Sequence, residues 1–347
     1  EKWDPIDTTI PNFEYHDELR VFARSSSDSK GPAMSLISAL QILQEKNIIP
    51  EYNIKVIMDF QEELGSPDLP TLTYGARGIA TATIKIFGPK TPLHSGQYGN
   101  YAPNPVFEAS RLISSLKNEE GIIQIPKFYD GVNLSAEERT ILNKIPENEQ
   151  QLNTRLGISN PDQVAETYQE ALQFPSLNIR GLQAGWTGKE VRTLIPDEVL
   201  IEIDMRLVPE TPAERQLDLL RKHITLQGYH LVDSIPNNQE RALHKKIASF
   251  NYRIGSKPFR TDMNSPIGAF LNSALHKVFG DSIVNMRTTG GSQPMAPFIK
   301  ALNLPAVSIR IPNPDNNIHG PNENLRLGNF REGILTCLAL LTEPLPK

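Results

Sequence analysis

The strand-length segments of this chain carry two different hydrophobic patterns, and the contrast limits the folds open to it. "NIKVIMDF" (53–60) is a nearly continuous apolar run, the pattern of a strand covered on both faces. "GIATATIKIF" (78–87) and "VLIEIDMRLV" (199–208) instead alternate apolar with small or polar residues, which is typical of a half-exposed antiparallel sheet. We therefore expect two kinds of sheet, placed in different parts of the fold.

The segments around the apolar run follow an α/β order. "RVFAR" (20–24) is a short strand candidate, and "PAMSLISALQILQEK" (32–46) carries apolar residues at helical spacing, namely Met34, Ile37, Leu40 and Leu43. After the alternating strands the same order resumes, with a buried strand expected at 304–311. Helices are expected at 213–227, 267–280 and 329–343. The chain thus predicts a split α/β domain, 1–75 and 258–347, around an α+β domain at 76–257.

Composition excludes several classes of protein. With 347 residues the chain has room for two domains, and its formal charge of −5 without a basic block argues against a nucleic-acid surface. No apolar run reaches the ~20 residues of a membrane span. The single cysteine, Cys337, excludes an intramolecular disulfide, and its apolar surroundings favour a core position. We expect a cytoplasmic protein, although the chain begins at Glu1 and a lost leader peptide is left open.

Ionisable residues follow three of the predicted strands. Asp28 comes after 20–24, Glu62 and Glu63 after 53–60, and His319 after 304–311. The carboxyl ends of strands form the usual binding crevice of an open α/β sheet, and carboxylates and imidazoles are the ligands of zinc. Two adjacent glutamates at a strand end can do different jobs, one binding a metal and one serving as general base.

Each of these residues has a simpler explanation when it is taken alone. Asp28 could cap a helix, the glutamate pair could be a solvated surface, and a histidine in a loop is commonly just exposed. The same holds for His94, which lies in the Gly- and Pro-rich segment "GPKTPLHSGQYGNYAPNP". Only their combination favours a metal-dependent active site.

Longer motifs then give a family resemblance. "ARSSSDSKGP", "MDFQEELGSP", "TYGARG", "PLHSGQYGNYAPNP", "RTTGGSQP" and "HGPNE" occur in the order seen in the M20 peptidase family. This group includes carboxypeptidase G, aminoacylase, carnosinase-type dipeptidases and succinyl-diaminopimelate desuccinylase, and the chain is most similar to the dipeptidase branch. The resemblance implies a zinc-peptidase-like α/β catalytic domain with a mostly parallel sheet, at 1–75 and 258–347. It also implies that an α+β lid and dimerisation domain, at 76–257, interrupts the catalytic domain.

The resemblance also implies roles for the metal-site residues. Asp28 resembles the carboxylate that bridges two metals, Glu63 a ligand of one metal, and His319 a ligand of the other. Glu62 resembles the general base. The implied cofactors are two divalent metal ions, zinc first, with manganese or cobalt as alternatives.

Substrate binding is assigned in the same way. His94 resembles the lid histidine that reaches an active site, commonly that of the partner subunit, and stabilises the oxyanion. Arg287 resembles the arginine that holds the substrate carboxylate, with Gly291 and Ser292 beside it.

The implied activity is metal-dependent hydrolysis of a dipeptide or short peptide with a free C-terminal carboxylate, in a homodimer. Two alternatives remain open at this stage. One is an N-acyl-amino-acid deacylase with the same metals. The other is a non-catalytic binding protein that has lost part of its metal site.

The chain departs from the family at two places. The family's first metal motif, His-x-Asp, should precede Trp3, and the adjacent His16 and Asp17 do not replace it. A helix, a strand and one more acidic ligand should separate Glu63 from "YGARG", where Asp68 lies too close to Glu63 to serve. Because the flanking motifs are intact, we expect the natural polypeptide to contain segments that are absent from this sequence.

Overall fold

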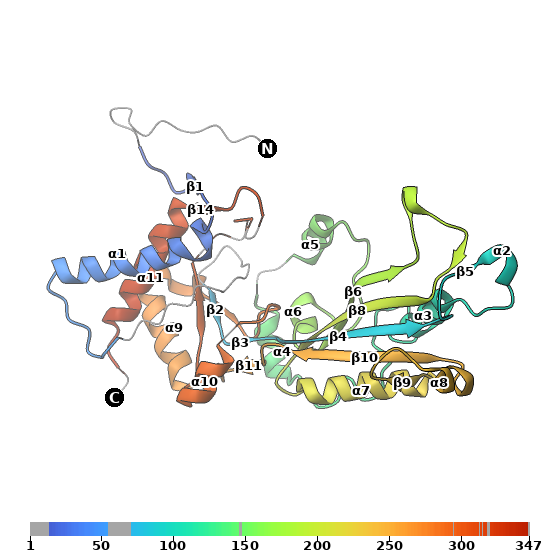
Figure 1. Cartoon of the computed structure of the whole chain (residues 1–347). Coiled ribbons are helices and arrows are strands. Elements are labelled where there is room, and N and C mark those ends of the chain that lie inside the picture. Colours follow the sequence, from blue (N-terminus) through green and yellow to red (C-terminus); the bar gives the residue numbers. More distant parts are fainter. Residues whose placement is uncertain are drawn as a thin grey trace. The chain divides into compact units, whose positions relative to one another are not determined.

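The chain divides into two compact units (Figure 1). The computed structural model describes residues 14–54, 71–145, 148–293, 295–311, 313, 315–317 and 320–345. Unit 1 combines Glu1–Tyr74, Thr261–Met286 and Pro305–Lys347, and unit 2 combines Gly75–Arg260 and Arg287–Leu304. The division differs from the predicted domain bounds chiefly at 287–304, which groups with unit 2. The catalytic and dimerisation roles of the two parts stay predictions.

Unit 2 is built on a five-stranded sheet with the order β6-β8-β4-β10-β9. Its strands are β4 (Gly78–Phe87), β6 (Ser176–Ala184), β8 (Glu198–Leu207), β9 (His230–Val232) and β10 (Ile247–Ile254). All neighbours are antiparallel except β9 and β10. Burial alternates along the whole of β4 and β8, so the predicted half-exposed antiparallel sheet is confirmed for these strands.

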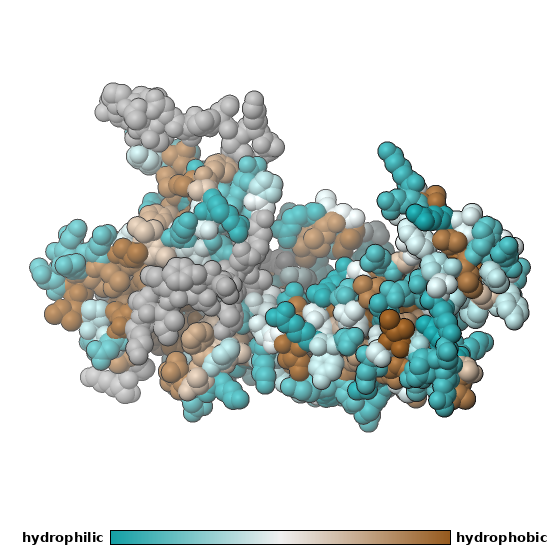
Figure 2. All heavy atoms as spheres, in the orientation of Figure 1, coloured by the Kyte–Doolittle hydropathy of each residue, from teal (hydrophilic) through white to brown (hydrophobic). Residues whose placement is uncertain are grey.

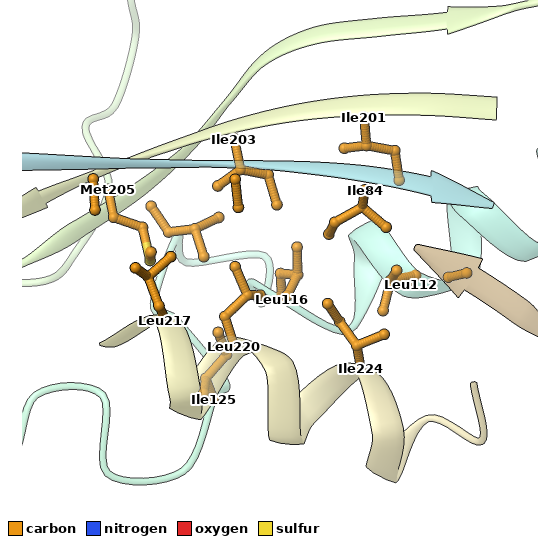
Figure 3. Close-up of a cluster of buried hydrophobic side chains, with 14 of the residues drawn as sticks. Ile84, Leu112, Leu116, Ile125, Ile201, Ile203, Met205, Leu217, Leu220 and Ile224 are labelled. Atoms are coloured by element: carbon orange, nitrogen blue, oxygen red, sulfur yellow. The ribbon is translucent and has the colours of Figure 1, made fainter. Parts of the chain in front are cut away.

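The core of unit 2 lies on one face of this sheet. Ile201, Ile203 and Met205 of β8 point toward the helices α3 (Pro105–Ser114) and α7 (Ala213–Leu226), as Figure 3 shows. The helix predicted at 213–227 is therefore confirmed. The residues between them on β8, including Asp204 and Arg206, are only partly buried and face the other side. The sheet thus has one packed face and one face open to polar chemistry.

Shorter elements complete unit 2. Two small strand pairs are present, β3 (Gly75–Ala76) with β11 (Phe259–Arg260), and β5 (Leu93–His94) with β7 (Leu194–Ile195). The other helical segments are α2 (Ser95–Tyr98), α4 (Ala136–Leu142), α5 (Glu149–Leu156), α6 (Tyr168–Ala171), η2 (Gly188–Glu190), α8 (Asn238–Leu243) and α10 (Ala296–Leu302).

Unit 1 contains long helices and short strands. The helices are α1 (Gly31–Glu45), α9 (Pro266–Phe279) and α11 (Leu327–Thr342), with a short η1 turn (Ser26–Lys30) and η3 (Gly280–Ser282). The strands are β1 (Arg20–Phe22), β2 (Thr71–Thr73), β12 (Val284–Met286), β13 (Ser308–Arg310) and β14 (Asn324–Arg326). These ranges confirm the helices predicted at 32–46, 267–280 and 329–343 and the strand within 20–24.

The sheet of unit 1 is mixed in the part that the structure describes. β2 pairs with β12 in parallel and with β13 antiparallel, while β1 and β14 form a separate antiparallel pair. The buried strand predicted at 304–311 is wrong in its extent, because β13 spans three residues that are only partly buried. Most of the apolar run 53–60 lies outside the described residues, so the mostly parallel sheet stays a prediction.

The helix α1 packs through small residues as well as through part of its apolar spacing, since Leu43 is buried and Leu40 packs in the same cluster. Met34 and Ile37 are 48% and 37% exposed, whereas Ser35 and Ala39 are fully buried. Apolar side chains accordingly gather at the surface in the region of α1 in Figure 2. A Cβ on Gly333 of α11 would lie 2.7 Å from Ser35 Oγ, so the two helices approach closely. Small residues are needed at this contact, and they displace the larger apolar side chains from it.

Two further sequence predictions concern α11 and the membrane. Cys337 packs with apolar residues of α1 and α11, and burial raises the pKa of its thiol to about 11, in agreement with a core role. Within the described ranges, each helix is too short or too polar to cross a membrane. The cytoplasmic location stays a prediction.

Candidate active-site residues in the two units

Asp28 lies in unit 1 on a turn that a single buried carboxylate organises. The turn joins β1 to α1, and Glu323 lies just before β14, the partner of β1. The Glu323 carboxylate accepts hydrogen bonds from the backbone N–H groups of Ser25 (2.9 Å), Ser27 (3.3 Å) and Asp28 (3.1 Å). Three backbone donors from one short turn on a single carboxylate fix the path of the backbone, and with it the position of Asp28.

The charge of Glu323 is stabilised by this arrangement. The residue is only 4% exposed, and burial alone would raise its pKa. The hydrogen bonds from Ser25, Asp28 and Ser27 outweigh burial and hold the pKa of Glu323 below its ordinary value. The Ser27 hydroxyl adds a donor at 3.2 Å, and Arg24 lies 3.4 Å away. Glu323 is thus a saturated anion that supports the turn, and its place in the "HGPNE" motif did not reveal this role.

The Asp28 side chain suits one position in a metal site. Its Oδ1 accepts a hydrogen bond of 2.6 Å from Ser29 Oγ, and its carboxylate is partly exposed on the fixed turn. Glu62, Glu63 and His319 lie outside the described residues. Within the described ranges there is no group of three His, Cys, Asp or Glu residues able to hold a metal ion. The described part of the chain therefore supplies one of the predicted ligands.

In unit 2, the loop 287–292 is joined to the start of the sheet by backbone contacts. Thr289 N–H donates to Gly75 C=O at 2.9 Å, and Arg77 N–H lies 3.3 Å from Thr289 O and 3.1 Å from Gly291 O. A Cβ on Gly75 would lie 2.7 Å from the Phe259 carbonyl oxygen, so this close approach requires glycine. These contacts bring Gly291 beside the first residues of β4.

Arg287 is held inside unit 2 by protein acceptors. One terminal nitrogen donates to Gln173 Oε1 at 2.7 Å and the other to Glu138 Oε1 at 2.5 Å. Burial, together with the nearby Arg260, lowers the pKa of Arg287, while Glu138 acts in the opposite direction. Both ends of this guanidinium therefore have partners within the protein.

Arg206 is a candidate site residue that our sequence reasoning missed. It lies near the end of β8 on the open face of the sheet, and its Nη1 donates to Ser292 Oγ at 3.1 Å. Its Nε is 4.0 Å from Asp204 Oδ1, and its side chain is 34% exposed. The alternation of 199–208 predicts that Arg206 faces outward, but only the fold shows that it meets Ser292.

His94 lies at the other end of the same sheet. β5 follows the Phe87 end of β4, while Arg206 is opposite Ile79 near the Gly78 end (Figure 1). The nine steps from Gly78 to Phe87 correspond to about 30 Å of strand. His94 is exposed, and its Nδ1 accepts the Gly96 N–H at 3.1 Å, which caps α2. Within unit 2, His94 and Arg206 are thus far apart.

Comparison with known proteins places this chain among metal-dependent peptidases. The Cys-Gly metallodipeptidase of Schizosaccharomyces pombe is 26% identical over 364 residues, covering 95% of this chain and 73% of that protein. The human beta-Ala-His dipeptidase is 24% identical and covers 93% and 68%.

Two solved structures have a similar fold. The M20 family metallo-carboxypeptidase Sso-CP2 from Sulfolobus solfataricus has a TM-score of 0.74 at 25% identity, covering 93% of this chain and 77% of that chain. Human carnosine dipeptidase 1 has a TM-score of 0.70 at 20% identity over 93% of this chain and 73% of that chain, which shows the shared fold.

The family model described as "Peptidase family M20/M25/M40" matches residues 1–343 of this chain. Membership of this family implies divalent metal cofactors, and it agrees with the α/β fold and with the predicted dipeptidase branch. The chain therefore belongs to the peptidase family M20/M25/M40 that its motifs indicate, and the prediction of a metallopeptidase is confirmed.

Proposed function

We propose that this protein hydrolyses the peptide bond of dipeptides or short peptides that end in a free carboxylate. The family match and the two relatives named as dipeptidases support the reaction. The observation that carries the substrate class is the Arg206–Ser292 pair on the open face of unit 2. A guanidinium and a hydroxyl side by side can hold a carboxylate through charge-assisted hydrogen bonds.

Arg206 is better placed for this role than Arg287. Both terminal nitrogens of Arg287 donate to Gln173 and Glu138, so a substrate would have to displace these acceptors. Arg206 donates to a neutral hydroxyl, which can turn and donate to an incoming carboxylate instead. We therefore assign the carboxylate contact to Arg206 and Ser292, with Gly291 shaping the loop and Arg287 supporting it.

The metal chemistry is assigned to residues of unit 1. Asp28, Glu63 and His319 are proposed as ligands of divalent metals, most simply two zinc ions, which supply Lewis-acid activation when bound. Glu62 is proposed as the general base, which takes a proton from the attacking water and delivers it to the leaving amine. The saturated Glu323 keeps the Asp28 turn fixed during this chemistry.

We propose that His94 works in the site of a second copy of the chain. The distance along β4 separates it from Arg206 of its own chain, and it lies exposed beside α2. A homodimer through unit 2 would present His94 to the partner as a donor to the oxyanion. Unit 2 then serves as the lid and dimerisation domain.

The neighbouring glutamates provide the test of the reaction. Glu62→Gln should remove dipeptide hydrolysis while bound metal, measured by elemental analysis, stays at the wild-type level. Glu63→Gln is the matched variant and should lose metal as well as turnover. Retained turnover in Glu62→Gln contradicts the assigned base. Wild-type hydrolysis of N-acyl-amino acids in place of dipeptides indicates the deacylase, and metal binding without turnover of either indicates the binding protein.

Mixing two inactive variants tests the role of His94. Glu62→Gln and His94→Asn homodimers should each be almost inactive, yet random exchange of subunits should restore about one quarter of wild-type activity. This follows because half of the dimers are mixed, and each mixed dimer has one site with both residues intact. Absence of recovery, with mixed dimers shown by differently tagged subunits, would place His94 outside the partner's site.

A further inference from the structure

Four arginines lie within or beside the loop 287–292, and they differ in how their charge is balanced: Arg287 belongs to the loop, and Arg77, Arg206 and Arg260 lie next to it. Arg260 forms a bidentate ion pair with Glu210, in which Nη1 donates to Oε1 at 2.5 Å and Nη2 to Oε2 at 3.3 Å. Arg287 forms an ion pair with Glu138. Each of these two guanidiniums therefore has a carboxylate of its own. Of the other two, Arg206 lies 4.0 Å from Asp204, and Arg77 has no ion-pair partner among the described residues.

Arg77 is a buried guanidinium without a direct carboxylate partner among the described residues. It is 7% exposed, and one terminal nitrogen donates to the Phe174 carbonyl oxygen at 2.7 Å. Within the described part of the chain its Nε has no hydrogen-bond partner. A buried cation that is bonded to a neutral carbonyl is costly, so its retention calls for a compensating anion.

The neighbouring positive group is Arg206. Burial, and after it the charge of Arg206, lowers the pKa of Arg77 to about 10, while Tyr168 and Asp204 act in the other direction. Asp204 is 4.0 Å from Arg206 and also accepts a hydrogen bond of 3.0 Å from Asn178. Two guanidiniums thus share one carboxylate that is already engaged, and this part of unit 2 carries an excess positive charge.

The backbone of Arg77 ties this charge to the proposed carboxylate site. Its N–H reaches the carbonyl oxygens of Thr289 and Gly291, the residues that lead into Ser292. Arg77 therefore lies directly under the loop that presents the Ser292 hydroxyl to Arg206. Any anion held by Arg206 and Ser292 would lie in the field of Arg77 as well.

We propose that Arg77 is a positioning residue for the substrate's C-terminal carboxylate, acting through Arg206 and the loop 287–292. This inference rests on the proposed function. The repulsion between Arg77 and Arg206 is relieved when a carboxylate arrives, so binding of the free acid is favoured over binding of an uncharged analogue. Arg77 thereby sets the preference of the enzyme for peptides that end in a free carboxylate.

The test compares a dipeptide with the same dipeptide carrying a C-terminal amide. Arg77→Met should raise the KM of the free acid roughly tenfold or more and leave kcat and the kinetics of the amide nearly unchanged. The acid-over-amide preference should therefore fall by the same factor. Arg77→Lys, which keeps the charge, should retain most of it. Arg180→Met is the matched control, because Arg180 lies on β6 paired with Glu202 and is expected to leave the preference intact.

Other outcomes contradict the proposal. Equal losses for acid and amide in Arg77→Met, or an unchanged preference, mean that Arg77 only supports the fold. If Arg77→Met does not fold, Arg77→Lys decides, since a loss shared equally by both substrates would overturn the electrostatic role. A wild-type enzyme without acid-over-amide preference would instead refute the proposed function, so the two failures are distinguishable.

Discussion

The turn around Asp28 in unit 1 and the loop 287–292 in unit 2 are both built around charged groups, but their hydrogen bonds are completed differently. In unit 1, Glu323 gathers three backbone N–H groups and a hydroxyl, so the anion is satisfied by the protein itself. In unit 2, Arg206 donates to one neutral hydroxyl and lies 4.0 Å from the Asp204 carboxylate. A satisfied charge fixes structure, whereas a partly satisfied one is available to a ligand.

The largest expected effect on stability concerns the satisfied anion. Glu323→Ala should lower the free energy of unfolding by about 2–4 kcal/mol, because several donors lose their acceptor at once. Urea unfolding followed by circular dichroism measures this loss. Glu343→Ala is the matched control, since Glu343 is also buried but accepts from the side chains of Ser273 and Lys277 and, among the described residues, not from backbone N–H groups. Equal losses in the two variants would show that the backbone donors do not matter.

Removing Arg206, the partly satisfied cation, should affect catalysis more than stability. Arg206→Met should lower kcat/KM for a dipeptide about 10- to 100-fold, the value of one charged hydrogen-bonded contact, while stability changes little. Steady-state kinetics and urea unfolding on the same preparation measure both quantities. Unchanged kinetics, or a loss of stability as large as that of Glu323→Ala, would remove the distinction between the two regions.

The ion pair between Arg287 and Glu138 should make the stability of the protein depend on pH. Burial raises the pKa of Glu138, but the Ser135 N–H and Arg287 outweigh it, so the pKa in the folded protein lies below its ordinary value of 4.5. The contribution of Glu138 to stability is therefore present above about pH 4.5 and is lost as the pH falls through the folded-state pKa. Glu138→Gln should flatten this part of the stability curve, measured by urea unfolding between pH 6 and pH 3. Glu137→Gln, at the exposed neighbouring position, should leave it unchanged.

The sequence predicts the sheet of unit 2 better than the packing of α1, because the two features depend on contacts of different range. Alternation along 78–87 and 199–208 is a local pattern, and the sheet of unit 2 follows it residue by residue. The apolar spacing of 32–46 predicts the helix α1, but not that Ser35 is buried while Met34 is exposed, because that choice depends on Gly333, almost 300 residues away.

The candidate site shows the same division. Asp28 and Ser292 were recognised within local motifs, but the pairs that explain them, Glu323 with Asp28 and Arg206 with Ser292, join distant segments. Arg77 stands inside the quoted motif "TYGARG", yet its burial beside Arg206 could not be read from that motif. Motifs thus identify which segments carry chemistry, and the tertiary fold decides which charges remain available.

The smallest expected effect would sharpen the comparison at Arg206 itself. Asp204→Asn removes the carboxylate that lies 4.0 Å from this guanidinium but keeps the shape and an acceptor. Because a charge at 4 Å in a partly exposed site contributes only about 1 kcal/mol or less, the KM of a dipeptide should fall about threefold. The KM of the C-terminal amide should stay the same, since it carries no charge for Arg206 to attract. A rise in KM for the acid would mean that Asp204 orients Arg206 more than it competes with the substrate, so that the guanidinium is prepared by the protein and not simply left open.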